Sequence, residues 1–454
     1  MRAPTSPQPA RGRRDRLLGP GPAGTGPWRR SVLMAVCGAL ATTSCSGVPS
    51  DVPPTARGVT VRPVDGGPDF HAGFSGGLPS DPSFFPLAVW SESVVDDTGW
   101  PVDRAAGLNV YLEPTADSDL PRIAEHGMHA ITSNPGGPSR GFFTLDEADM
   151  WAGPGDAAWT GNGPGQGDIC SPRDNECGYS AMALAAARAP AGALRVTNYG
   201  KGVVFWETDT EAARFVNDFQ DVVSADVYWF TDPGVCGPSE GGALLGDGTT
   251  LPDDECRLAA NYGRTVERVR SLVEPPGSRP VWNVVEVGHP FREEHAPTIT
   301  IPQIRAAVWS SLIAGARGIV YFVHNFAGPC PTQHAIRDCG EELQRGIAAI
   351  DRDVTDLAPV LNAPFVDGLV NHDDTVNVSV KIHDGALYLL TGSATAQAHT
   401  ATMTVGCAAD SATVVGENRT IPVVDGKVTD EFADGNAVHI YRLDGADRCF
   451  GGRS

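Results

Sequence analysis

Short apolar runs alternate along most of the chain with longer segments in which apolar residues recur at helical spacing. Eight of these runs are apolar on both faces, as parallel strands buried on both sides require. We therefore predict eight strands. They fall at residues 84–90, 108–114, 129–133, 142–147, 194–200, 225–230, 280–288 and 318–326.

Helical patterns lie between these runs. Eight strands alternating with helices predict an α/β fold, a (β/α)8 TIM barrel. The alternative is an open doubly wound sheet, but no glycine-rich phosphate motif opens a helix, so nothing favours a nucleotide-binding fold. The clearest helical segments span residues 121–129, 180–189, 210–223, 256–273 and 301–316.

The pattern changes at about residue 358, where apolar and polar residues begin to alternate between turn residues. This alternation predicts a small all-β sandwich domain. Before the barrel, residues 46–80 are rich in Pro, Gly, Ser and Asp and read as a disordered tether. The predicted order is an export signal with a lipobox at 1–45, the tether at 46–80, a barrel catalytic domain at 81–357 and the sandwich at 358–454.

The first 45 residues combine a basic leader with a short apolar run at 31–43, which is typical of an export signal. The sequence TTSC, which ends at Cys45, resembles a bacterial lipobox, although Thr42 stands where that motif prefers Leu. We predict an extracellular or cell-surface protein that is lipid-anchored through Cys45 to the outer face of the bacterial cell membrane. The alternative is cleavage nearby and free secretion.

Charge and cysteine spacing narrow the possible partners. The leader carries seven Arg and one Asp within a chain of net charge −21, so the remainder is near −27. Such an acidic chain repels nucleic acid and anionic lipid head groups.

The spacing of the cysteines contains no CxxC motif, which argues against a zinc site. We predict no metal, no cofactor and a monomer. Eight further cysteines predict four local disulfides, which the sequence alone does not fix: Cys170 with Cys177, Cys236 with Cys256, Cys330 with Cys339, and Cys407 with Cys449.

Two glutamates stand at predicted strand ends, where the loops that follow the strands build the mouth of a barrel. Glu147 ends strand four and Glu286 ends strand seven. Retaining glycoside hydrolysis needs one carboxyl that donates a proton and a second, ionised carboxyl about 5–5.5 Å away that attacks the sugar. The pair therefore predicts cleavage of a poly- or oligosaccharide.

The barrel also resembles a known family. Glu at strands four and seven, Tyr at strand six and a trailing β-sandwich resemble the clan-A retaining glycoside hydrolases, as do the stretches FFPLAVW, LDEADMW and IRAAVWSSLIAGARGIVYF. The resemblance implies that Glu147 is the general acid/base and Glu286 the nucleophile. It also implies that Tyr228 hydrogen-bonds the nucleophile.

The sequence departs from that family at two places. Asp146 stands where the family usually has an Asn that binds the sugar 2-hydroxyl, and its charge would raise the pKa of Glu147. No Trp ends strand eight, where Phe322 and His324 stand. The predicted substrate-binding residues are Asp146, Tyr228, Trp151, Trp90, Asn198 and His324.

Each assignment has a structural alternative. The acidic residues around Glu147 could cap a helix or hold calcium, Tyr228 and the tryptophans could be packed core residues, and His324 could cap a strand. Two other functions stay open. One is a carbohydrate-binding surface lipoprotein on a barrel that has lost turnover; the other is a metal-dependent barrel hydrolase, against which strand one lacks an HxH pattern.

Overall fold

The computed structural model describes residues 58–134, 137–293, 295–406 and 409–445. The predicted leader and the predicted lipidation site at Cys45 lie outside these residues. Within the described ranges, no helix is both long enough and apolar enough to cross a bilayer. The predictions of export and anchoring therefore remain predictions from the sequence.

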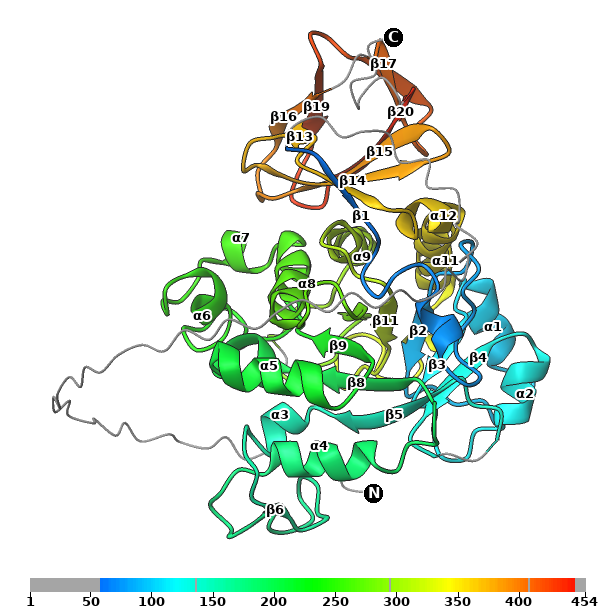
Figure 1. Ribbon diagram of the computed structural model, residues 1–454, viewed down its shortest axis with the longest axis vertical. Coiled ribbons are helices and arrows are strands. Elements are labelled where there is room, and N and C mark those ends of the chain that lie inside the picture. The colour runs from blue at the N-terminus through cyan, green and yellow to red at the C-terminus, as the bar shows by residue number, and fades with distance from the viewer. Residues whose placement is uncertain (1–57, 135–136, 294, 407–408, 446–454) are drawn as a thin grey trace, which may run out of the picture. The chain divides into compact units, whose positions relative to one another are not determined.

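A closed barrel of eight strands forms the first part of the described chain (Figure 1). Every neighbouring pair in the barrel is parallel, and the order around the barrel is β10-β11-β2-β3-β4-β5-β8-β9. This closed parallel sheet confirms the TIM barrel and excludes the open doubly wound alternative. The strands are β2 (Leu87–Trp90), β3 (Val110–Leu112), β4 (His129–Thr132), β5 (Gly141–Asp146), β8 (Arg195–Tyr199), β9 (Val222–Asp226), β10 (Val281–Glu286) and β11 (Ile319–Phe322).

Helices follow most of the barrel strands, although among the described residues none lies between β4 and β5. Two of the longer helices begin at capping boxes. Thr208 and Glu211 form a reciprocal capping box at the start of α5, and Thr300 and Gln303 form one at the start of α9. The helices between barrel strands are α1 (Trp100–Ala105), α2 (Leu120–Glu125), α3 (Ala148–Trp151), α4 (Gly178–Ala186), the π-helix η2 (Gly202–Trp206), α5 (Asp209–Asp218), α6 (Gly241–Leu245), α7 (Asp253–Cys256), α8 (Ala260–Leu272) and α9 (Ile301–Ile313). Three more follow the last barrel strand: α10 (Ala335–Asp338), α11 (Glu341–Asp356) and α12 (Ala358–Leu361).

The barrel strands bury both faces, as their two-sided apolar pattern predicts. On β9, Val222 belongs to the cluster inside the barrel, whereas Val223 and Ala225 belong to the layer between strands and helices. The same alternation puts Val196 inside the barrel on β8. Residues that continue the inward series therefore reach the mouth at the ends of the strands.

The predicted position of strand six is wrong by several residues. The sequence predicts 225–230, but β9 ends at Asp226, and its register with β8 runs from Val196↔Val222 to Tyr199↔Ala225. Aromatic residues at 228–230 carry a strong β-propensity, but they have already left the sheet. Tyr228 therefore lies in the loop after the strand, and Asp226 occupies the strand end.

Part of the predicted tether is structured. Strand β1 (Thr60–Arg62) pairs antiparallel with β12, and the 3-10 helix η1 (Phe70–Gly73) follows it. Phe70, Phe74 and Leu78 pack against the cluster inside the barrel, and the main chain binds the loops that precede β8 and β10. Residues 58–80 thus close the end of the barrel opposite the mouth, a contact that low local hydrophobicity conceals in the sequence.

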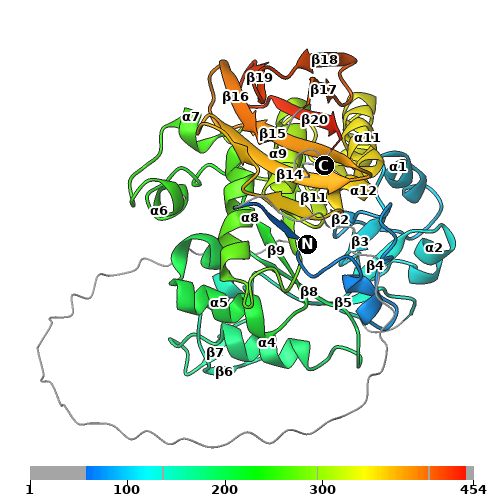
Figure 2. The same cartoon turned by 45° about the horizontal axis from the view of Figure 1, so that its top comes forward.

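The chain after the barrel folds into antiparallel sheets, which confirms the predicted all-β region. A seven-stranded sheet has the order β1-β12-β14-β15-β20-β17-β18, and a three-stranded sheet has the order β13-β16-β19. Figure 2 shows β14, β15 and β20 side by side. The strands are β12 (Phe365–Asp367), β13 (Val370–Asn371), β14 (Val376–His383), β15 (Ala386–Ser393), β16 (His399–Val405), β17 (Ser411–Val414), β18 (Arg419–Pro422), β19 (Lys427–Phe432) and β20 (Val438–Asp444).

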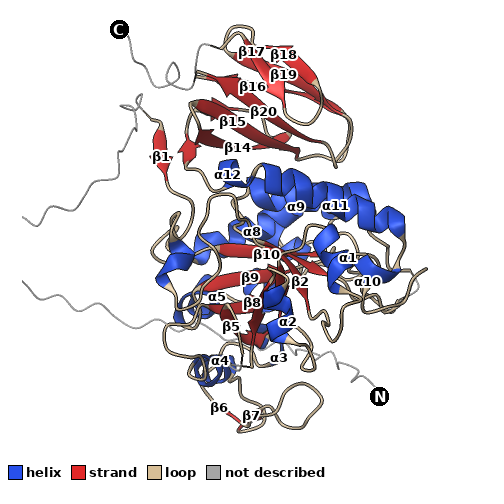
Figure 3. Cartoon of the chain, turned by 90° about the vertical axis from the view of Figure 1, so that its right-hand side faces the viewer, coloured by secondary structure: helices blue, strands red, loops and turns tan. Residues whose placement is uncertain are grey.

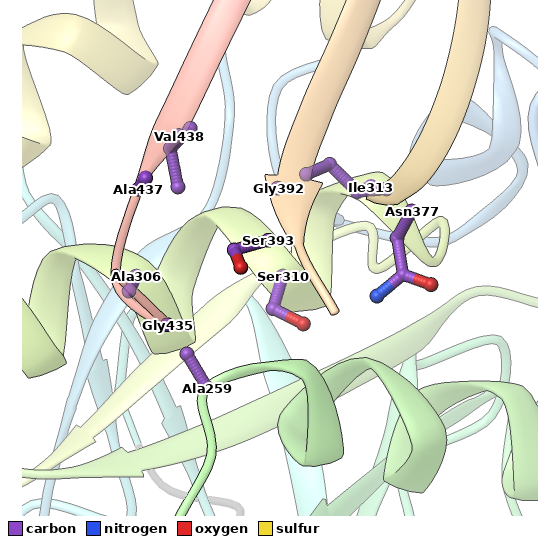
Figure 4. A pocket seen from close by; sticks show the side chains of 10 residues that line it. All are labelled: Ala259, Ala306, Ser310, Ile313, Asn377, Gly392, Ser393, Gly435, Ala437 and Val438. Carbon is purple, nitrogen blue, oxygen red and sulfur yellow. The ribbon is translucent and has the colours of Figure 1, made fainter. Parts of the chain in front are cut away.

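The two sheets share one apolar core, and the larger sheet also packs on barrel helices. Met403 of β16 and Phe432 of β19 lie in the same cluster as Leu389 of β15. On the other face, Leu390 and Ile440 join the cluster of the barrel helices, and α9 contacts β14 and β15 (Figure 3). A cavity of only about 10 Å³ remains at this junction, beside Ser310 and Ser393 (Figure 4).

Three of the four predicted disulfides are present. They join Cys170 to Cys177, Cys236 to Cys256 and Cys330 to Cys339. Each lies in the connection that follows β5, β9 or β11, the strand ends at which the predicted site residues gather. The short strands β6 (Ala158–Trp159) and β7 (Cys170–Ser171) pair within the first of these connections.

The fourth predicted disulfide would join Cys407 to Cys449, and both cysteines lie outside the described residues. The pairing of Cys407 with Cys449 therefore stays a prediction. It rests only on the fact that these are the last two cysteines of the sequence and have no other cysteine between them.

Candidate active site

Glu147 follows the last residue of β5 in a left-handed backbone conformation, with φ of 49°. Residues other than glycine adopt this conformation at a cost and do so mostly where the surrounding structure fixes them. Here the Glu147 main-chain N–H donates to the Asn198 carbonyl at 2.9 Å, which continues the contact with β8 past the strand end. The turn therefore sets where the Glu147 carboxyl points.

The neighbouring acids of the sequence LDEAD have separate structural roles. Asp149 is buried, and its carboxylate accepts from the main-chain N–H groups of Gly200 and Val203 at 2.8–3.2 Å, at the start of η2. Asp146 accepts from the Asn198 side-chain amide at 3.0 Å. Asp149 thus anchors a helix start, whereas Asp146 and Glu147 remain at the barrel mouth.

A line of polar side chains crosses from β8 to β9. The side-chain oxygen of Asn198 (Oδ1) accepts from the Ser224 hydroxyl at 2.8 Å, while its side-chain amide nitrogen donates to Asp146. Asn198 and Ser224 are both buried and continue the inward series of their strands. Two residues further along β9 comes Asp226, and a hydrogen bond from Asn198 lowers its pKa. One amide therefore orients a carboxylate on each side of β8.

Glu147 and Asp226 are coupled electrostatically. The charge of Asp226 raises the pKa of Glu147 more than the charge of Asp146 or Asp149 does. Burial first, and then these charges, raise the pKa of Glu147 well above its ordinary value. Burial likewise raises the pKa of Asp146 to about 6 and that of Asp226 to about 8. We call Asp146, Glu147 and Asp226, together with Asn198, the carboxylate cluster.

Glu286 ends β10 as predicted and is completely buried. The Tyr262 hydroxyl lies 2.6 Å from one of its oxygens and 2.7 Å from the other, and the Thr231 hydroxyl donates to it at 3.1 Å. Burial raises the pKa of Glu286 to about 7, against the opposing effect of the Tyr262 hydrogen bond. A buried carboxylate with hydroxyl donors on both oxygens is well held, but it has no oxygen open to solvent.

Tyr228 does not make the hydrogen bond that the family resemblance implies. Its hydroxyl donates to Asp226 at 3.3 Å, and Tyr262 of α8 takes the place beside Glu286. Burial and the charge of Asp226 raise the pKa of Tyr228 well above its ordinary value, and the charges of Glu147 and Glu286 act in the same direction.

Aromatic side chains continue from Tyr228 toward the surface. Its ring lies 5.3 Å from Phe322 and 6.1 Å from Phe291, and Phe322 lies 5.1 Å from His324. Phe326, which is 44% exposed, follows at 6.5 Å from Phe322. We call Tyr228, Phe291, Phe322, His324 and Phe326 the aromatic strip; it leads from solvent to the carboxylate cluster.

The remaining predicted residues lie at the edges of this region. The Trp151 indole N–H donates to the Asp146 carbonyl at 2.7 Å, and its ring packs beside Trp159 and the Cys170–Cys177 loop. Trp90 packs edge-on against Phe143 in the barrel interior. Burial lowers the pKa of His324, which favours a neutral ring. Trp151 and Trp90 thus mainly pack, while His324 belongs to the aromatic strip.

Among the residues that the structure describes, no three His, Cys, Asp or Glu side chains are grouped so that they could hold a metal ion. The loops after β8 and β9 are instead joined by an ion-pair network, in which the Lys201 ammonium lies 2.6 Å from Asp232 and 2.7 Å from Glu240. Lys201, three positions after Asn198, is therefore already neutralised by two other carboxylates.

Comparisons with known proteins show similarity only among solved structures. No family model and no curated protein matches the chain. A structure described as a glycoside hydrolase shares 11% identity and a TM-score of 0.46, covering 81% of this chain and 94% of its own. A family 27 β-L-arabinopyranosidase from Geobacillus stearothermophilus shares 10% identity and a TM-score of 0.43, covering 80% of this chain and 97% of its own.

A family 5 glycoside hydrolase from Bacteroides vulgatus gives similar values: 11% identity, a TM-score of 0.44 and coverage of 82% and 92%. Likeness at this level carries no argument about activity or substrate. The functional conclusion therefore depends on the side chains.

Three residues of the site escape prediction from the sequence. Asp226 is missed because the strand end is misplaced, although the polar residues Ser224 and Asp226 alternate with apolar ones, which could have revealed an inward polar face. Tyr262 lies in the middle of a helix, where a tyrosine is usually a core residue. Thr231 lies in a loop and has no local signal.

Proposed function

We propose that the chain is an exported glycoside hydrolase that cleaves a poly- or oligosaccharide by a retaining mechanism. Glu147 is the proton donor and Glu286 the nucleophile. The observation that carries this proposal is the state of Glu147: burial and neighbouring carboxylates raise its pKa well above the ordinary value, at the mouth of a (β/α)8 barrel. A carboxyl that keeps its proton near neutral pH is what protonation of a glycosidic oxygen requires.

The two carboxyls divide the reaction between them. Glu147 gives its proton to the leaving oxygen as the Glu286 carboxylate bonds to the anomeric carbon and the glycosidic bond breaks. Glu147, now ionised, then takes a proton from water, whose oxygen displaces Glu286 and restores both groups. Because Glu286 is fully buried and bonded to Tyr262, attack requires a rearrangement that exposes one of its oxygens.

The aromatic strip supports a carbohydrate substrate. Pyranose rings have apolar C–H faces, and aromatic side chains beside a catalytic centre bind such faces. Phe326 is exposed at the outer end of the strip, and Tyr228 contacts Asp226 at its inner end. We propose that a sugar unit of the substrate lies along this strip.

Export and anchoring belong to the same proposal. The basic leader, the apolar run and the lipobox-like TTSC support lipidation at Cys45, and three disulfides fit an oxidising compartment. Cys45→Ala should release the protein from the membrane fraction into the medium. Retention of that variant on the membrane would contradict the anchor.

The test of the reaction uses activated aryl glycosides and a panel of polysaccharides. Glu286→Gln should abolish turnover, and Glu147→Ala should lose it on poor leaving groups but regain part of it when azide is added with a good leaving group. Glu341→Gln is the matched control, because that side chain is 84% exposed on α11. Unchanged turnover in Glu286→Gln, or full activity in Glu147→Ala, would contradict the assignments.

The buried state of Glu286 favours one alternative, a carbohydrate-binding protein without turnover. In the described conformation, the Tyr262 hydroxyl lies within hydrogen-bonding distance of both oxygens of Glu286, and the carboxylate is buried. Neither oxygen is therefore presented as a nucleophile. Binding of an oligosaccharide by the wild type, with no hydrolysis of any substrate in the panel, would favour this alternative.

A further inference from the structure

A pair of polar side chains at the barrel mouth has no role in the two-carboxyl scheme. Glu92 lies two positions after the end of β2, and its side chain is only 2% exposed. His334 lies in the connection after β11, with its Nδ1 atom 2.6 Å from Glu92 Oε1. Because β10, β11 and β2 are consecutive in the barrel and parallel strands end at one rim, this pair shares the rim of Glu286.

The surroundings of Glu92 fix which nitrogen of the His334 ring carries the proton. Glu92 Oε1 also accepts from the Ser93 main-chain N–H at 2.7 Å and lies 2.9 Å from Arg337 Nη1. Arg337 is held in turn by Asp103, at 2.6 and 3.0 Å. Burial raises the pKa of Glu92, against the opposing effects of Arg337, Ser93 and His334. N–H groups that converge on one oxygen make it an acceptor, so the proton of the neutral His334 ring belongs on Nδ1.

The other ring nitrogen of His334, Nε2, is open to a ligand. The side chain is 37% exposed, and no group of the described residues forms a hydrogen bond with Nε2. With the proton on Nδ1, Nε2 of the neutral ring is an acceptor. A hydroxyl group can donate to such an atom, so Glu92 and His334 together present an oriented acceptor for a ligand that carries hydroxyl groups.

Main-chain pairing places His334 beside the aromatic strip. Asn325 and Thr332 exchange two main-chain hydrogen bonds, at 2.7 and 3.1 Å. Residues 332–335 therefore lie alongside 323–325, the segment that carries the histidine of the strip, and the third disulfide closes the same loop. The strip thus supplies aromatic faces, and the neighbouring chain supplies a polar group at their edge.

We propose that His334 is a specificity-determining residue, which accepts a hydrogen bond from a hydroxyl of the sugar unit next to the one that Glu286 attacks. Glu92 is the positioning residue that fixes the His334 ring. This inference rests on the proposed glycosidase function. A site built to hydrogen-bond a hydroxyl discriminates strongly against a ligand that lacks it. The preferred substrate is therefore an oligosaccharide rather than a glycoside of a single sugar.

The first measurement is made by NMR on protein labelled with ¹⁵N in its histidines. At pH 8, the wild-type His334 ring, assigned by the loss of its signals in His334→Gln, should be protonated at Nδ1. Tetrasaccharides of glucose, galactose, mannose, xylose and arabinose are then added to Glu286→Gln, which keeps them intact. At least one should shift the Nε2 resonance of His334 to lower frequency, as acceptance of a hydrogen bond does.

The second measurement compares that tetrasaccharide with the 4-nitrophenyl glycoside of the same sugar. His334→Ala should lower kcat/KM for the tetrasaccharide about tenfold more than for the aryl glycoside, mainly through KM, because one hydrogen bond to the neighbouring unit is lost. His334→Gln, which keeps an acceptor, should recover part of the difference. His383→Ala is the control, since that side chain is 32% exposed in the sandwich.

A merely structural role of His334 would lower kcat/KM for both substrates alike. Equal losses in His334→Ala would therefore overturn the inference. So would a wild-type ring protonated at Nε2, or an Nε2 resonance that no tetrasaccharide moves, and the first of these needs no variant of the pair to fold. A shifted Nε2 resonance in a protein that turns over no glycoside would overturn the proposed turnover alone and leave the sugar contact standing.

Discussion

At the scale of single residues, neighbouring donors give three similar acids different tasks. Asp149 accepts from main-chain N–H groups and anchors η2, and Asp146 accepts from the Asn198 amide, whereas neighbouring carboxylates raise the pKa of Glu147. The sequence reveals that carboxylates end strand four, and it supplies Glu147 and Glu286. It does not reveal which acids meet, because that depends on where Asn198 and Tyr262 arrive from other elements.

Tyr262 provides a test of the nucleophile side of the site. Tyr262→Phe removes the hydroxyl that bonds both oxygens of Glu286, so the pKa of Glu286 should rise further above about 7. The acid limb of the pH profile of kcat/KM should therefore move upward by about one unit. Tyr321→Phe is a matched control, since its buried hydroxyl donates to Asp351 at 2.6 Å on the helix side of the barrel. An acid limb that stays in place in Tyr262→Phe would contradict the assignment of Glu286.

At the scale of elements, hydrophobic periodicity predicts the barrel because its strands are buried on both faces and helical spacing recurs between them. The misplaced boundary of β9 shows the limit of this approach. Aromatic residues in a loop satisfy the same β-propensity as residues in a strand, and only the register with β8 separates them. That error moved Asp226 from a strand end into a strand interior and so concealed it.

The aromatic strip comes from the end of β11 and from the loops after β9, β10 and β11, and Phe326 is its most exposed described member. Phe326→Ala should raise KM for an oligosaccharide about two- to tenfold and leave kcat nearly unchanged, because it removes stacking outside the reacting centre. Val424→Ala, at a valine that is 60% exposed in the sandwich, is the control. An unchanged KM in Phe326→Ala would exclude this end of the strip from substrate binding.

At the scale of the whole molecule, the segment at 58–80 joins the two halves of the described chain. Strand β1 completes an edge of the larger sheet, while Asp65 binds Arg270 of α8 at 2.5 and 3.0 Å. His71 follows in η1, is only 8% exposed, and its Nδ1 atom has no partner. The composition of this segment resembles that of a linker, and only long-range contacts distinguish it from one.

His71 should make the fold sensitive to acid. Burial and the charge of Arg317 lower its pKa from 6.5 to about 4, so the unfolded chain takes up a proton that the folded chain refuses between these values. Stability should be complete above pH 6.5 and fall by up to about 3 kcal/mol as the pH approaches 4. His129, with its pKa also lowered to about 4, acts in the same direction.

Urea unfolding at pH 7.5 and pH 4.5 measures this loss. His71→Gln should lose less stability between the two conditions than the wild type, whereas His383→Gln, in the sandwich, should behave as the wild type. Equal losses in His71→Gln and the wild type would show that His71 does not contribute.

The early start of the folded body has a consequence for a lipoprotein. Under the proposed anchoring at Cys45, the described chain begins at Gly58, only thirteen positions after the lipid. A polypeptide of that length reaches at most about 45 Å when fully stretched. A tether that extended to the barrel would have reached more than twice as far. Gly58 would therefore stay within about 45 Å of the lipid anchor, and the enzyme would act on glycans close to its own cell surface rather than on polymers far out in the medium.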